Sequence, residues 1–229
     1  MFSINNILLF SYLLPLIFAV FLKREIRSRI EVLVIIIYCL TFFLLIKLQI
    51  ILIQDNPAIW AKAKDLVFPI YTFIELVFFS IIYWLNIKTN RFKILCTTVT
   101  ILFVTFQVFY YYSVKSARID SIPVGVETLI IYIYIFYFFY SRFTNIDDQY
   151  IYNHYCFWIS IGIMIYLGGS FFLYILGNHL TQEENDKYWY FTFIVEIAKN
   201  ILFVISLFVF ARHSKQKIPN QNIPYLDFN

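Results

Sequence analysis

The chain is 229 residues long, 61% of them hydrophobic and 14% charged, and its mean hydropathy is +0.74. Soluble domains carry about 25% charged residues and about 45–50% apolar ones, so this composition excludes a soluble protein. The net charge of +4 comes from basic loops and does not indicate a nucleic-acid partner. The composition predicts a multi-pass membrane protein in a lipid bilayer.

Seven apolar stretches are long enough to cross that bilayer. A helix needs about 20 apolar residues to cross a hydrocarbon core of about 30 Å. Because lipid offers no hydrogen bonds, the backbone N–H and C=O groups of each stretch must pair with one another, as they do in a helix. The stretches, each bounded by polar clusters, are 4–22, 31–53, 66–87, 94–114, 123–140, 152–176 and 188–211. We expect an all-α seven-helix bundle forming one domain over residues 1–211. Pro15 should kink the first helix, while Pro69 and Pro123 should lie in first turns.

The distribution of Lys and Arg predicts the orientation. Eleven of them fall on one side of the predicted bundle and five on the other. Because short cytoplasmic loops retain basic residues, we expect the N-terminus outside and the C-terminus in the cytoplasm. The tail from 212 to 229 begins basic and contains Pro219 and Pro224. Its composition favours a disordered cytoplasmic end at the membrane surface, with a partner-docking peptide as the alternative.

Five ionisable residues stand out inside the predicted helices: Lys47, Glu75, Glu127, Glu196 and Lys199. A charge at a helix centre costs about 2.5–3.5 kcal/mol on insertion scales, so each of them requires a partner or a water-filled cavity. In the predicted orientation Glu75 and Lys199 lie near mid-membrane, and the other three lie in the outer half.

The spacing of polar residues on the last helix indicates whether its charges face lipid or the interior of the bundle. At 100° per residue Thr192, Glu196, Lys199, Asn200, Phe203 and Ser206 form one stripe of about 120°, and such a stripe cannot face lipid. Thr72 lies one turn before Glu75 on the third helix. Two interpretations stay open. One is a polar pocket open to the outside; the other is a structural network in which the two lysines neutralise two carboxylates and the third carboxyl is protonated.

Other chemistry has weaker support in the sequence. Cys39, Cys96 and Cys156 are scattered singly and the chain has three histidines, which disfavours a disulfide framework or a metal site. Gly162 and Gly169 lie on one face of the sixth helix and predict close packing against another helix.

Two segments resemble those of a known group of proteins. They are FPIYTFIELVFFS at 68–80 and EIAKNILF at 196–203. They resemble small, uncharacterised seven-helix membrane proteins of Bacteroidota, which have a Glu in helix three and a Lys-Asn-like step in helix seven. The resemblance implies a bacterial inner-membrane location and supplies no activity.

Lys199 and Glu75 also resemble the Schiff-base lysine of helix seven and the helix-three counter-ion of microbial rhodopsins. The sequence departs from that family: Glu196 is three residues before Lys199 where the family has an Asp at four, and helix six lacks the Trp-x-x-Tyr-Pro pattern. We therefore expect no cofactor and keep retinal on Lys199 as an alternative.

These observations predict a non-enzymatic membrane protein that senses a ligand or serves as a partner subunit. The expected site is an outward-facing intramembrane pocket formed by Glu75, Glu196 and Lys199, with Lys47, Glu127, Thr72 and Asn200 around it. The alternative is a small proton-coupled carrier in which Glu75 titrates. Carriers often contain inverted repeats and broken helices, and the sequence has no clear sign of either, which favours the sensor or partner hypothesis.

Overall fold

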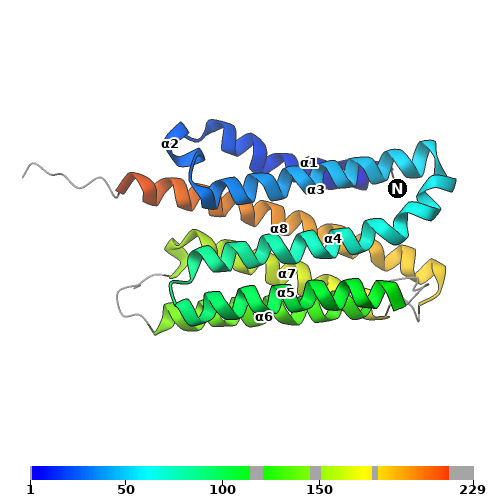
Figure 1. Ribbon diagram of the computed structural model, residues 1–229. Coiled ribbons are helices and arrows are strands. Elements are labelled where there is room, and N and C mark those ends of the chain that lie inside the picture. Colours follow the sequence, from blue (N-terminus) through cyan, green and yellow to red (C-terminus); the bar gives the residue numbers. More distant parts are fainter. Residues whose placement is uncertain (1, 114–120, 145–150, 177–179, 217–229) are drawn as a thin grey trace, which may run out of the picture.

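The computed structural model describes residues 2–113, 121–144, 151–176 and 180–216. The described residues are helical and contain no strand. Besides the short helix α2 (Arg24–Arg27) and the 3₁₀ turn η1 (Ile151–Asn153), seven long helices run side by side (Figure 1). They are α1 (Phe2–Phe21), α3 (Ile30–Asp55), α4 (Pro57–Asn86), α5 (Asn90–Ser113), α6 (Ser121–Phe143), α7 (Tyr155–Leu176) and α8 (Gln182–Gln216).

Six of these helices are long and apolar enough to span a membrane. Their spanning parts are Ile30–Asp55, Pro69–Asn86, Asn90–Ser113, Ile122–Phe143, Tyr155–Ile175 and Lys187–Arg212, and Asn6–Phe21 of α1 forms a shorter apolar helix. The predicted all-helical membrane bundle is confirmed.

The helix contacts form a ring. Going round it, α1 packs against α3, α3 against α4, α4 against α6, α6 against α7, α7 against α8, and α8 against α1. Helix α5 lies outside this ring against α4 and α6. In this order α4 and α8 are on opposite sides, so side chains from both can meet in the interior.

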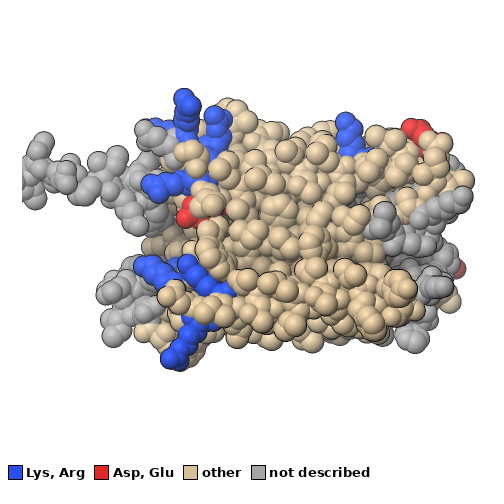
Figure 2. All heavy atoms as spheres, viewed as in Figure 1, with Lys and Arg blue, Asp and Glu red and all other residues tan. Residues whose placement is uncertain are grey.

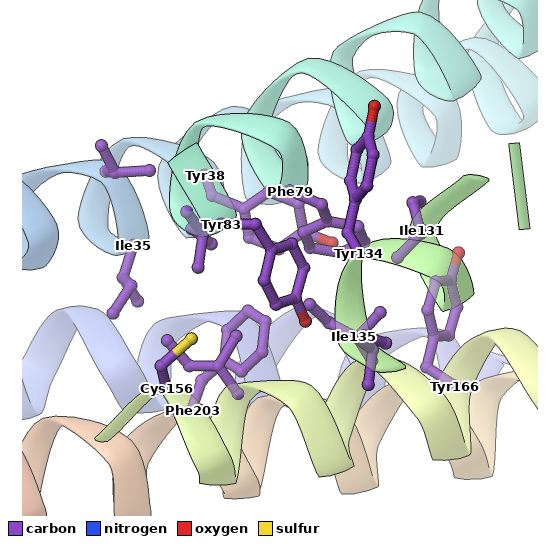
Figure 3. Close-up of a cluster of buried hydrophobic side chains, with 14 of the residues drawn as sticks. Ile35, Tyr38, Phe79, Tyr83, Ile131, Tyr134, Ile135, Cys156, Tyr166 and Phe203 are labelled. Atoms are coloured by element: carbon purple, nitrogen blue, oxygen red, sulfur yellow. The ribbon is translucent and has the colours of Figure 1, made fainter. Parts of the chain in front are cut away.

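Aromatic and branched side chains fill that interior. Figure 3 shows a part of this core in which side chains from five helices point toward one another. The labelled residues are Ile35 and Tyr38 of α3, Phe79 and Tyr83 of α4, Ile131, Tyr134 and Ile135 of α6, Cys156 and Tyr166 of α7, and Phe203 of α8.

Glycines bring α7 and α8 together, as the sequence predicts. A Cβ atom on Gly169 would lie 2.6 Å from Val195 Cγ1, and one on Gly162 would lie 3.2 Å from Leu202 Cβ. Small residues let transmembrane backbones approach closely. These contacts fix α8 against α7 on either side of Lys199.

Helix α8 begins outside its apolar part with a capping box. Glu184 Oε2 accepts hydrogen bonds from the backbone nitrogen and the Oγ1 of Thr181, at 3.0 and 2.8 Å. The backbone nitrogen of Glu184 donates in return to Thr181 Oγ1 at 3.4 Å. The hydrogen bonds to the carboxylate, first the one from the Thr181 backbone, hold the pKa of Glu184 below its ordinary value.

The predicted position of Pro69 in a first helical turn is wrong. Helix α4 begins at Pro57, so Pro69 lies inside the helix and not in its first turn. Pro57 already starts the helix, and at Pro69 the helix continues without the hydrogen bond that the missing N–H would donate, which favours a bend there. Helix α8 continues to Gln216, so the first residues of the predicted disordered tail are helical, while its spanning part ends at Arg212, next to the predicted end at 211. The predicted tail beyond Gln216 lies outside the described residues.

Candidate functional site

The polar stripe of α8 faces the interior of the ring. Thr192, Glu196, Lys199, Asn200 and Ser206 are all buried, and Lys199 is 0% exposed. Lysine is almost never fully buried unless it is paired. The predicted orientation of this stripe is confirmed, and its buried ammonium requires partners.

Lys199 is surrounded by tyrosines and one carboxylate. Its Nζ atom donates to the hydroxyl of Tyr38 at 2.7 Å and to that of Tyr12 at 3.4 Å. Glu75 Oε1 lies 3.8 Å from the same nitrogen and forms an ion pair with it. The nitrogen also lies 3.8 Å from the centre of the Tyr166 ring. Hydrogen bonds, opposite charge and the negative face of an aromatic ring together replace the water that the ammonium lost.

Glu75 accepts hydrogen bonds from both sides. The Tyr38 hydroxyl donates to Glu75 Oε1 at 3.1 Å, and the Tyr166 hydroxyl donates to Oε2 at 3.2 Å. Tyr38 therefore connects the ammonium and the carboxylate, since its hydroxyl accepts from Lys199 and donates to Glu75. The carboxylate is 3% exposed and has contacts on both oxygens.

Glu196 occupies the neighbouring part of the same network. Its Oε1 atom accepts hydrogen bonds from Tyr12 and, at 3.1 Å, from Tyr71. The Tyr12 hydroxyl accepts from Lys199 and donates to Glu196, which joins Glu196 to Lys199 and its partner Glu75. The hydroxyls of Tyr71 and Tyr166 lie 3.3 Å apart. Two carboxylates thus share a continuous hydrogen-bond network with one ammonium.

We call this set of side chains the Tyr–Glu–Lys network. It comprises Tyr12 of α1, Tyr38 of α3, Tyr71 and Glu75 of α4, Tyr166 of α7, and Glu196 and Lys199 of α8. Its members come from five of the seven long helices. Lys199 lies about 18 Å from Lys187 and about 20 Å from Arg212 along the spanning part of α8, at 1.5 Å per residue. The network is therefore at the middle of the span.

Two other predicted site residues are buried near this network. Asn200 Nδ2 donates to the Oγ of Ser11 at 2.8 Å, which ties α8 to α1. Thr72 is 3% exposed, one turn from Glu75. The structure thus brings Glu75, Glu196 and Lys199 together as predicted, with Asn200 on the same helix face.

Glu127 is also buried, at 1% exposure on α6. Its Oε1 atom has no hydrogen-bond partner within the described part of the chain. Tyr134 lies two turns further along α6, and its hydroxyl donates to the backbone oxygen of Cys96 at 3.3 Å. Glu127 is therefore an interior carboxyl near the network, and it forms no hydrogen bond with Tyr134.

Lys47 does not join the site, and this corrects the prediction. The buried face of α3 passes through Tyr38, Phe42 and Ile46. The residue after Ile46 is turned by about 100°, and Lys47 is exposed. Its ammonium is thus on the outer side of α3, where a long side chain extends toward the membrane surface.

The four tyrosines are the part of the site that the sequence did not indicate. The chain contains 19 Tyr and 27 Phe residues, which are spread through all the helices. A signal was available at Tyr71, which is one helical turn before Glu75, and at Tyr166, which shares the glycine face of α7. Neither Tyr12 nor Tyr38 stands out from the surrounding apolar residues.

The network is closed in this structure. Lys199, Glu75 and Glu196 have exposures of 0%, 3% and 6%, and Phe42 and Phe203, both fully buried, lie beside Lys199 and Tyr38. The outward opening of the site therefore stays a prediction.

Comparisons with known proteins found no matching family model, no similar curated protein and no similar solved structure. The resemblance to the Bacteroidota proteins and the retinal alternative at Lys199 both stay predictions.

Proposed function

We propose that the protein crosses a bacterial inner membrane seven times, with its N-terminus outside and its C-terminus in the cytoplasm. The gathering of basic side chains at one end of the bundle supports this orientation. Among the described residues, Lys and Arg cluster where α2 lies (left in Figure 2), and fewer of the described ones are visible at the opposite end. Exposed members of the cluster include Lys23, Arg24, Arg27 and Arg91.

Fusions at Asn229 test the orientation. A fluorescent protein placed there should fluoresce, because it folds in the cytoplasm. A periplasmic phosphatase at the same position should be inactive, and phosphatase activity would reverse the orientation.

We also propose that the protein is a non-enzymatic sensor of a ligand or a membrane partner subunit, and that the Tyr–Glu–Lys network sets its conformation. The supporting observation is that one ammonium and two carboxylates at mid-span hold five helices through mutual contacts. Such a network has few alternative arrangements, since moving one helix breaks bonds on several others. A ligand or a partner that favours one arrangement would shift the whole bundle.

A proton-coupled carrier is the second candidate. The observation in its favour is that the network contains two carboxylates and one ammonium. The carboxylate that the ammonium does not neutralise can bind a proton. Glu127 supplies a third interior carboxyl with an oxygen that lacks a hydrogen-bond partner among the described residues. A carrier would have to open this closed interior to water in each cycle.

Proton flux separates the two functions. Purified protein is placed in liposomes that contain a pH-sensitive dye, and Glu75→Gln is compared with wild type. Glutamine keeps the shape and accepts hydrogen bonds but cannot titrate. For a sensor or partner subunit we expect no flux from either protein at any imposed pH gradient.

Glu184→Gln is the matched control, because it removes a carboxylate outside the membrane. Flux in wild type that persists in Glu184→Gln and disappears in Glu75→Gln would reject the sensor or partner function and establish the carrier.

A further inference from the structure

An apolar groove lies between α1 and α8 on the outer surface of the bundle. It has a volume of about 330 Å³. Its lining includes Ile17, Phe18 and Phe21 of α1 and Ile201, Val204 and Ile205 of α8. Several of these side chains are open to the surroundings, and Phe21 is 81% exposed. In the hydrocarbon region such a groove accepts an apolar chain.

A basic segment continues from the end of the groove. Phe21 ends α1, and Lys23, Arg24 and Arg27 follow, all exposed. Two residues of extended chain span at most about 7 Å, so the first of these charges is adjacent to the groove. Ile26, which is 5% exposed, anchors α2 against the bundle. The charges are thus attached to a fixed element.

The segment has an excess of positive charge. From Lys23 to Arg29 it contains four basic residues and one acidic residue, Glu25. The end of the bundle that carries this segment is the one where Lys and Arg gather in Figure 2. A negatively charged group held there would be next to an apolar groove that runs into the membrane.

We propose that the groove binds an acyl chain of an anionic phospholipid, whose phosphate is held by Lys23, Arg24 and Arg27. The apolar lining and the positive charge are two independent features, and this class of molecule is complementary to both. Basic residues near a membrane surface attract anionic lipids, and pockets between transmembrane helices bind their headgroups. The site is separate from the Tyr–Glu–Lys network and does not depend on its function.

Native mass spectrometry of the full-length protein tests the proposal. The detergent-purified protein is incubated with phosphatidylglycerol or with phosphatidylcholine of the same acyl chains. We expect one phosphatidylglycerol to be retained, with an affinity at least about tenfold above that for phosphatidylcholine. Equal retention of the two lipids would overturn the proposal.

Two sets of variants test the apolar groove and the basic residues separately. Ile201→Trp fills the groove, and Ile194→Trp, two turns earlier on the exposed face of α8, is its control. We expect loss of bound lipid with the first variant and retention with the second. Ile205→Phe provides a smaller filling of the same groove if Ile201→Trp does not fold.

The combined change of Lys23, Arg24 and Arg27 to Gln should weaken phosphatidylglycerol binding by about 10- to 100-fold. The control is the pair Lys88→Gln and Arg91→Gln, two exposed cations at the same end of the bundle. That control should leave binding unchanged.

Lipid loss with the charge variants but not with the groove variants would overturn the proposal, because a headgroup contact alone would explain it. If the groove variants change the mass from dimer to monomer and leave lipid binding intact, the groove is a contact between copies of the chain. The proposal is then wrong.

Discussion

Lys199→Met should destabilise the protein through Glu75 and not through Glu196. The substitution shortens the side chain by one atom and removes its charge. It leaves the Glu75 carboxylate buried without the ammonium 3.8 Å away. Removing one partner of a buried ion pair costs about 3–5 kcal/mol. This is the loss that we expect for the single variant.

The structure also predicts how much of that loss a second substitution restores. Two hydrogen bonds from Lys199, each worth about 0.6 kcal/mol in a membrane, and a desolvated cation–π contact worth about 1–2 kcal/mol are lost whatever happens at Glu75. The rest is the penalty of the uncompensated carboxylate. Adding Glu75→Gln removes that penalty, so the double variant should recover about 1–2 kcal/mol.

Glu196→Gln should recover less in the same background. The Glu196 carboxylate accepts hydrogen bonds from Tyr12 and Tyr71, and the described residues form no ion pair between it and Lys199. The measurement is SDS-induced unfolding in mixed micelles, followed by near-ultraviolet circular dichroism. Lys47→Met, which removes an exposed cation, is the control and should change stability by less than about 0.5 kcal/mol. Strict additivity at Glu75, or stronger coupling at Glu196, would refute the assigned pairing.

Three further predictions concern other parts of the structure. Tyr38→Phe removes the hydroxyl that connects the ammonium to the carboxylate and should cost about 1–3 kcal/mol in the same unfolding assay; an unchanged stability would contradict the bridging role. Gly169→Ala places a Cβ 2.6 Å from α8 and should destabilise the bundle by about 1–3 kcal/mol, whereas Gly125→Ala adds a Cβ in open space and should be neutral or stabilise α6 by up to about 1 kcal/mol. The lowered pKa of Glu184 means that its stabilising effect on the start of α8 is complete above the ordinary carboxyl pKa and is lost as the pH falls through the lowered value. Hydrogen-exchange protection of the first turn of α8 should follow this dependence, and Thr181→Ala should weaken it, because only the backbone hydrogen bond to the carboxylate then remains.

Most of the fold could be predicted because the bilayer imposes it. The length of each apolar stretch determines a spanning helix, and the charged clusters mark its approximate ends. The interior position of Glu75 and Lys199 followed from the cost of placing a charge in lipid. The start of α4 at Pro57 was not predicted, because a helix can extend beyond the hydrocarbon core without an apolar signal.

The rotation of the more apolar helices could not be predicted. In a soluble protein, hydrophobic periodicity shows which face is buried, but lipid is as apolar as the interior of a membrane protein. On α1 the exposed Phe10 and the fully buried Tyr12 are two residues apart, and nothing in their local sequence assigns one to lipid and the other to the core. The same ambiguity hid Tyr38. The tyrosines of the network become visible only when the helices are assembled.

The choice of partner for Lys199 also depends on assembly. Glu196 is three residues away on the same helix, a spacing at which side chains are neighbours, so the sequence allowed a pair within α8. The structure instead pairs Lys199 with Glu75 of α4, on the opposite side of the helix ring. A pair within one helix would neutralise the charges without constraining the fold. The pair across the ring does both, because separating α4 from α8 would leave two uncompensated charges at the middle of the membrane. Glu196 remains bound to Tyr12 of α1 and Tyr71 of α4, so the second carboxylate adds a link from α8 to α1 and a further one to α4.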